Sequence, residues 1–218
     1  KKIGLSNSLS MNTRTSHLQG WIMYAIAAFF YFYDFILRLI PSIMMENIIE
    51  RLQITTNQFG IVELSFYIVY TPMQLLCGPL LDEYGAKRVL PGVITLCILG
   101  SILSAITKNY YWYLLARTLI GFGSAFAFVC VLKIASEWLP KKNYPFLAGL
   151  TTTFGMLGGI FSESVAPAFN QFDQTYFYSG IVIIGAMLLI LSLIFIEDKE
   201  SHDDSEFDLK LIIKDIRL

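Results

Sequence analysis

The chain has 218 residues, of which 55% are hydrophobic and only 15% are charged, and its net charge is −1. A soluble domain carries roughly 25% charged residues, so this composition argues against a soluble protein. A nearly neutral chain also lacks the basic surface that nucleic-acid binding requires, and no nucleic-acid partner is expected. The lipid bilayer is the expected surrounding for most of the chain.

Six long apolar segments follow one another along the chain, separated by short charged loops. They span residues 21–44, 59–81, 89–107, 111–132, 144–169 and 176–196. About 20 helical residues cross a hydrocarbon core roughly 30 Å thick. The pattern predicts an all-α membrane protein whose six transmembrane helices occupy residues 21–196. Residues 1–20 are expected to form a cytoplasmic tail, and residues 197–218 a cytoplasmic linker with an amphipathic helix.

Basic residues predict the orientation of these helices. Of the 16 Lys and Arg residues, eleven fall in the tails and loops of one side, whereas the other side receives only Arg51 and Lys108. Loops rich in Lys and Arg stay in the cytoplasm, so both termini are expected there. The spans also divide into two three-helix units of similar length, 21–107 and 111–196. Because three is odd, the second unit is inverted relative to the first, which is a common construction of secondary transporters.

Five charged residues lie inside the predicted spans: Asp34, Arg38, Glu63, Arg117 and Glu163. Charges in a bilayer are costly, and they usually face the interior of a helix bundle or a water-filled cavity. Counting residues from the outer end of each helix places four of them roughly 8–9 Å below that boundary, with Asp34 one turn deeper. The five residues are therefore expected to share one layer.

This layer is a candidate site for a solute and a proton. Arg38 or Arg117 would hold a carboxylate or phosphate group through paired N–H donors. Asp34 or Glu63 would bind and release the proton, because burial disfavours a charged carboxylate. Static salt bridges between helices are the alternative interpretation, and Glu63 and Glu163 could also lie at the membrane interface. Polar residues at helical spacing extend the candidate site: Tyr31, Tyr67, Tyr70 and Gln74.

Glycines in the fourth and fifth spans are expected to bring helices close together. They are Gly121, Gly123, Gly155 and Gly159. A glycine lets neighbouring helix backbones approach, and packing accounts for these positions better than contact with a ligand does.

The chain offers little for catalysis or for cofactor binding. It has three cysteines and two histidines, and they form no Cys/His cluster with the spacing of metal ligands. No metal and no other cofactor are therefore expected. The G-x-S-x-G and H-E-x-x-H patterns are absent from the sequence, so the protein is not expected to be an enzyme.

Residues 78–88 form a distinctive loop between the second and third spans. Their sequence is Gly-Pro-Leu-Leu-Asp-Glu-Tyr-Gly-Ala-Lys-Arg. It resembles the loop between helices two and three of the major facilitator superfamily, whose pattern is G-x-L-x-D-[RK]-x-G-R-[RK]-[RK]. Glu83 and Ala86 stand where the family often has basic residues. The matching residues are Gly78, Leu80, Asp82, Gly85, Lys87 and Arg88.

Each matching residue of the loop has an expected physical role. Gly78 would permit close packing, Asp82 would accept hydrogen bonds from a facing helix N-terminus, and Gly85 would fit a tight turn. Lys87 and Arg88 would stay on the cytoplasmic side. The resemblance implies that the loop acts as a cytoplasmic latch between two halves of a transporter.

Two further segments resemble the same family. Residues 117–123, Arg-Thr-Leu-Ile-Gly-Phe-Gly, resemble the fourth-helix motif R-x-x-x-G-x-G, which implies that Arg117 faces a central cavity. The fifth span lacks the G-P-x-x-G-G run of drug/proton antiporters. The Asp34-x-x-x-Arg38 pattern looks like that of bacterial members that import amino acids or nucleosides, which implies a bacterial inner membrane.

The resemblance covers all six spans and implies the N-terminal half of a twelve-helix transporter. A C-terminal six-helix half, or a second copy of this chain, would complete the pathway. The favoured function is secondary active transport of a small polar solute such as an amino acid or nucleoside, by proton-coupled symport and alternating access. Exchange of organic anions or phosphate esters is one alternative, and a non-transporting membrane scaffold or assembly subunit is another.

Overall fold

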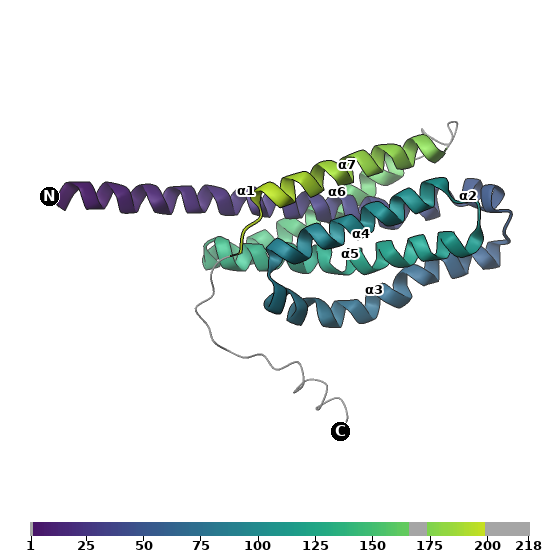
Figure 1. Ribbon diagram of the computed structural model, residues 1–218, viewed down its shortest axis with the longest axis horizontal. Coiled ribbons are helices and arrows are strands. Elements are labelled where there is room, and N and C mark those ends of the chain that lie inside the picture. The colour runs from purple at the N-terminus through teal and green to yellow at the C-terminus, as the bar shows by residue number, and fades with distance from the viewer. Residues whose placement is uncertain (1, 166–173, 199–218) are drawn as a thin grey trace, which may run out of the picture.

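The computed structural model describes residues 2–165 and 174–198, with side chains from residues 18 to 165 and from 177 to 198. These ranges form a bundle of long helices (Figure 1). A short 3-10 turn, Lys141–Asn143, precedes α6. The α-helices of the described ranges are α1 (Lys2–Ile43), α2 (Met45–Leu52), α3 (Thr56–Tyr84), α4 (Ala86–Ile106), α5 (Tyr110–Trp138), α6 (Tyr144–Val165) and α7 (Gln174–Phe195).

Six helical segments of the described chain are long and apolar enough to cross a membrane. They are Leu18–Ile43, Thr56–Tyr84, Ala86–Ile106, Tyr110–Trp138, Lys141–Val165 and Phe177–Phe195. Each predicted segment coincides with one of them, which confirms the all-α membrane fold with six transmembrane helices. The fourth helix runs six residues past its predicted end at 132, to Trp138.

The two segments predicted to flank the six spans are described to different extents. Helix α1 is continuous from Lys2, so the predicted tail is the first part of this helix, and it extends beyond the bundle in Figure 1. The predicted amphipathic helix near the C-terminus lies outside the described residues, as do residues 166–169 of the fifth predicted segment.

Helix packing repeats between the two three-helix units. In the first unit α3 packs on α5, and in the second unit the equivalent helix, α6, packs on α1. Likewise α4 packs on α5, and its equivalent, α7, packs on α1. The first helix of each unit therefore packs against the second and third helices of the other unit, and the two third helices, α4 and α7, pack on each other. This arrangement leaves α1 and α5 in contact at the centre of the bundle, with α3 beside α5 (Figure 1).

N-terminal caps set the register of α3 and α5. Thr55 and Gln58 form a capping box at the start of α3, and the Asn109 side chain accepts a hydrogen bond from the Tyr111 N–H at the start of α5. Both helices begin at the same end of the bundle (Figure 1). Glu63 and Arg117 each lie about two turns beyond their caps. The two residues therefore reach a similar depth.

The sequence analysis missed α2, a short helix between α1 and α3. Its residues Ile48 and Leu52 are buried and lie one turn apart. Arg51 of this helix donates hydrogen bonds to the carbonyl oxygens of Ser104 (2.7 Å) and Ala105 (3.2 Å) at the C-terminal end of α4. A cation at a helix C-terminus is stabilising, which gives Arg51 a structural role on the side with few basic residues.

Candidate functional site

Asp34 and Arg38 form an ion pair on α1. The spacing of four residues places them one turn apart, and Arg38 Nη2 lies 3.0 Å from Asp34 Oδ2. The Asp34 side chain is fully buried, whereas 16% of the Arg38 side chain is exposed. Charges inside a bundle need such partners, because an unpaired buried charge is very costly. The pair leaves Arg38 as its accessible member.

Arg117 connects three helices from its position on α5. Its Nη1 donates a hydrogen bond to the carbonyl oxygen of Leu37 on α1 (3.1 Å), and its Nη2 lies 3.5 Å from Glu63 Oε1 on α3. The Arg117 side chain is 1% exposed and the Glu63 side chain 21%. Ser42 Oγ lies 3.5 Å from the second carboxylate oxygen of Glu63. Arg117 is thus the buried centre of these contacts, and Glu63 is its more accessible partner.

The ring of Phe66, on α3, contacts both arginines. Its centroid lies 5.7 Å from Arg38 Cζ and 4.9 Å from Arg117 Cζ, within the range of cation–π attraction. The ring is fully buried and stacks on the Tyr70 ring with a centroid separation of 5.4 Å. Arg38 also lies over the rings of Tyr70 (4.6 Å) and Phe35 (4.9 Å). Three aromatic rings therefore surround the guanidinium group of Arg38.

Asp34, Arg38, Glu63 and Arg117 together form what we name the charge cluster. Its two positive and two negative side chains balance one another. In the described part of the chain, the Nε atoms of Arg38 and Arg117 are buried and have no hydrogen-bond acceptor. Buried polar groups are normally paired, so the charge cluster has spare N–H donors from which an anionic oxygen could accept hydrogen bonds.

The predicted tyrosines and Gln74 lie around the charge cluster. The half-buried Tyr31 packs edge-on against Phe35, with ring centroids 5.1 Å apart. Gln74 donates a hydrogen bond to the Tyr70 hydroxyl (2.7 Å). Tyr67 is 43% exposed beside Phe66. Polar side chains thus continue along α3 away from the charge cluster.

Glu163 does not join the charge cluster. It is exposed on α6, and none of the ion pairs between described residues includes it. Helix α6 packs mainly on α1, whereas Glu63 lies on α3, which packs on α5. The expected grouping of five charged residues is therefore corrected to four. Counting residues gives depth along a helix but not direction around it.

The loop motif forms a tight turn between α3 and α4. Gly85 has φ = 75°, a conformation that favours glycine. A Cβ atom at Gly85 would collide with the carboxylate of Asp198, which follows α7. Asp198 Oδ1 in turn accepts a hydrogen bond from the backbone N–H of Lys87 (2.9 Å), in the first turn of α4. Asp198 therefore fills the N-terminal capping role that the sequence analysis gave to Asp82.

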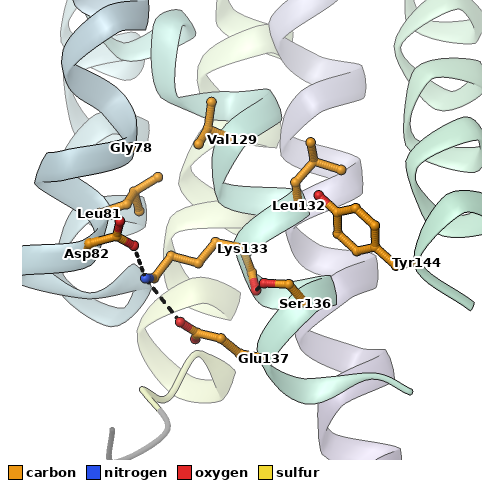
Figure 2. Close-up of a pocket in the computed structure, with 9 residues that line it drawn as sticks. All are labelled: Gly78, Leu81, Asp82, Val129, Leu132, Lys133, Ser136, Glu137 and Tyr144. Carbon is orange, nitrogen blue, oxygen red and sulfur yellow. Dashed lines mark hydrogen bonds and ion pairs between the residues drawn. The ribbon is translucent and has the colours of Figure 1, made fainter. Parts of the chain in front are cut away.

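Asp82 instead pairs with Lys133 on α5. Lys133 Nζ lies 2.6 Å from Asp82 Oδ1 and 3.0 Å from Glu137 Oε1 (Figure 2). These residues border a hollow of about 360 Å³ between α3, α5 and the start of α6. Gly78 also borders it, and a Cβ atom there would meet no described atom within 4 Å. The close packing predicted for Gly78 is therefore absent from the described part of the chain.

The remaining predicted glycines lie at close helix contacts. A Cβ atom at Gly121 would lie 2.5 Å from the carbonyl oxygen of Phe66, and one at Gly123 would lie 2.7 Å from the carbonyl oxygen of Val93. On α6, a Cβ atom at Gly155 would lie 2.6–2.7 Å from the Tyr31 and Phe35 rings, and one at Gly159 would lie 3.1 Å from Leu39. A Cβ atom at the neighbouring Gly158 would collide with the Phe32 backbone. These contacts join α5 to α3 and α4, and α6 to α1.

Sequence reasoning missed Phe66 as part of the site and did not predict the Lys133 ion pairs. The pairing of Lys133 with Glu137 had a signal, because opposite charges four residues apart on a helix are neighbours. No such signal exists for Phe66, because an apolar residue in an apolar span does not indicate that an arginine lies beside it. The ring is recognisable only once α1, α3 and α5 are placed together.

Comparison with known proteins matches the chain to one family and to several transporters. A family model described as the Major Facilitator Superfamily matches residues 21–216. The chain is 26% identical to a probable sulfoacetate transporter from Cupriavidus necator over 83% of the chain and 42% of that protein. It is 26% identical to a hexuronate transporter from Bacillus subtilis over 76% of the chain and 39% of that protein. It is 23% identical to a putative glycerol-3-phosphate transporter from Arabidopsis thaliana over 75% of the chain and 33% of that protein. The chain thus spans less than half the length of each.

Proposed function

This chain belongs to the Major Facilitator Superfamily, and we propose that it forms one half of a secondary transporter for a small organic anion. The chain spans less than half the length of its relatives. We therefore infer that a second six-helix half, or a second copy of this chain, completes the transporter. The two halves would rock about a central site and open it to each side of the membrane in turn.

The observation that carries this proposal is the meeting of Arg38 and Arg117 at the Phe66 ring, inside membrane-spanning helices. A guanidinium group binds carboxylate, sulfonate or phosphate oxygens through paired N–H donors. Arg38 is the more exposed of the two and would contact the anion. Arg117 is buried and would hold α1 and α3 in place.

The names of the relatives support an anionic solute. Sulfoacetate, hexuronates and glycerol 3-phosphate all carry a negative charge. Their common chemistry fits a partly exposed arginine better than the amino acid or nucleoside that the sequence analysis favoured does. We therefore place the organic-anion alternative first.

The charge balance of the cluster supports the proposal of proton coupling. An anion at Arg38 would add a negative charge and would weaken the pairing of Arg38 with Asp34. A proton bound by Asp34 or Glu63 would restore the balance, so anion and proton would favour each other's binding. Symport with a proton is therefore the proposed mode. Exchange is the alternative mode, in which a second anion rather than a proton drives the return step.

We also propose that both termini lie in the cytoplasm of a bacterial cell. The α3–α4 turn carries Lys87 and Arg88, and the 3-10 turn before α6 carries Lys141 and Lys142, all at one end of the bundle. Basic loops favour the cytoplasmic side. At the other end, Arg51 binds the carbonyl groups of α4, so its presence there reflects capping rather than topology.

Uptake into proteoliposomes that contain the complete transporter tests the proposal. Labelled glucuronate, sulfoacetate and glycerol 3-phosphate are the probes, and a labelled nucleoside is the neutral comparison. We expect Arg38→Gln to abolish anion uptake, and Lys108→Gln, an exposed control in the loop before α5, to leave it unchanged. Anion uptake that is equal in both variants, or uptake of the nucleoside alone, contradicts the proposal.

The mode of coupling is read in the same vesicles. Symport predicts that an inward proton gradient accelerates anion uptake, whereas exchange predicts acceleration by anion loaded inside.

A scaffold without transport is the second candidate function, because both arginines of the charge cluster already have carboxylate partners within this chain. It predicts no uptake of any probe by a correctly folded protein.

A further inference from the structure

We propose that Phe66 is a positioning residue for the anion site, and that Gly121 fixes where Phe66 lies. The ring would hold the guanidinium groups of Arg38 and Arg117 at one place in the transporter. This inference rests on the anion transport proposed above, and it assigns the site a residue with no charge.

The contact between α5 and α3 at Gly121 is a contact of backbones. A Cβ atom at Gly121 would lie 2.5 Å from the carbonyl oxygen of Phe66 and 3.2 Å from its Cα. Backbone atoms inside a helix cannot swing aside as a side chain can, so a larger residue at 121 must push α3 away. Gly121 therefore determines how close Phe66 comes to α5.

Gly121 and Arg117 act on the same residue of α3. They are four positions apart, so they lie on one face of α5, one turn from each other. The glycine contacts the Phe66 backbone, and the arginine lies over the Phe66 ring at 4.9 Å. The R-x-x-x-G spacing thus has a physical meaning in this chain. The glycine leaves room for the Phe66 backbone, and the arginine one turn earlier lies beside the Phe66 ring.

The ring of Phe66 also contacts the guanidinium group of Arg38, at 5.7 Å. Since each guanidinium carbon lies within ~6 Å of the same ring centroid, the two are at most ~12 Å apart. Stacking against Tyr70 restricts the ring, which is fully buried. Arginine side chains are flexible and lose entropy when they are ordered. A fixed ring in contact with both arginines lets an incoming anion bind guanidinium groups that are already ordered.

Two substitutions with matched controls test this inference in the complete transporter. Phe66→Leu removes the ring, and Phe59→Leu removes another buried ring of α3, which none of the cation–π contacts among the described residues includes. Gly121→Ala displaces the Phe66 backbone, and Gly60→Ala adds a methyl group to α3 where no described atom lies within 4 Å. Initial rates of glucuronate uptake give KM and the maximal rate for each variant.

We expect Phe66→Leu and Gly121→Ala each to raise the KM for glucuronate about tenfold, as the loss of cation–π contacts predicts. The controls should keep the normal KM. KM does not depend on the amount of protein in the membrane, so poorer folding alone cannot produce this result. The double variant should show a KM close to that of either single variant, because both changes act through the position of one ring.

Outcomes for this inference and for the proposed function are separate. An unchanged KM in Phe66→Leu overturns the inference, provided that Arg38→Gln abolishes glucuronate uptake. The inference is also overturned if the increases in KM of Phe66→Leu and Gly121→Ala multiply in the double variant. The proposed function is instead overturned if the unsubstituted protein takes up no glucuronate, or if Arg38→Gln takes it up at the normal rate.

Discussion

Arg117 donates a hydrogen bond to the carbonyl oxygen of Leu37 over 3.1 Å, and this carbonyl group lacks the partner that a helix normally supplies. The residue four positions later is Pro41, which lies inside α1 and has no N–H to donate. Arg117 therefore satisfies a carbonyl group that Pro41 leaves free. The bonded residue immediately precedes Arg38, so one arginine holds the backbone that presents the other.

This relationship predicts how Arg117 and Pro41 depend on each other. Arg117→Ala should abolish anion accumulation and lower stability, because it leaves the Leu37 carbonyl and the Glu63 carboxylate without their partner. An unsatisfied buried carbonyl costs about 1–3 kcal/mol. Adding Pro41→Ala supplies a new N–H in α1 and should restore part of the melting temperature but no transport. Thermal unfolding in detergent measures the first effect and vesicle uptake the second. A double variant no more stable than Arg117→Ala contradicts this account of the hydrogen bond.

Asp34 is predicted to be needed for coupling to protons. Asp34→Asn keeps the size of the side chain but can neither carry a charge nor exchange a proton. We expect it to abolish accumulation of glucuronate driven by a proton gradient, while the protein still inserts into the membrane. Glu163→Gln is the matched control, since Glu163 is exposed on α6 and lies outside the charge cluster. Accumulation at the normal level in Asp34→Asn would show that the proton binds elsewhere.

Lys133 is predicted to stabilise the end of the bundle that carries the α3–α4 turn. Its ammonium group lies between Asp82 and Glu137, at 2.6 Å and 3.0 Å (Figure 2). Lys133→Met leaves the two carboxylates to repel each other and should cost about 1 kcal/mol, since Asp82 is largely exposed. A lower melting temperature is the expected readout. Lys142→Met, at an exposed position of the same end, is the comparison, and equal melting temperatures in the two variants would contradict the role of Lys133.

Gly85 is predicted to be intolerant of a side chain. Alanine would have to adopt φ = 75°, and its Cβ atom would meet the Asp198 carboxylate. The backbone conformation alone costs roughly 1–2 kcal/mol for a residue with a Cβ atom. Gly92→Ala, at an open position of α4, should instead be neutral or stabilising. Unfolding of both variants in detergent measures the difference, and equal stability of Gly85→Ala and Gly92→Ala would contradict the prediction.

The sequence was sufficient for the helices because crossing a bilayer depends on length and apolar content. Both properties can be read along a single segment, and the six spans agree with the structure to within a few residues except at Trp138. Depth along a helix could be counted as well, which is why Arg38 and Asp34 were grouped correctly with Arg117 and Glu63.

Contacts between helices could not be predicted in the same way. Glu163 was placed with the other charges because its depth is similar, but its direction around α6 depends on how that helix packs on α1. Phe66 and Asp198 were missed for a related reason. Each acts through a neighbour far along the chain, Arg117 in one case and the first turn of α4 in the other.

The central claim is that Arg38 binds an anionic solute inside the membrane. Its most direct test is the heat of glucuronate binding to the purified complete transporter, compared between the unsubstituted protein and Arg38→Gln. We predict measurable binding that weakens at least about tenfold in the variant, as loss of a charged hydrogen bond implies. Equal affinity in the two proteins would contradict the claim.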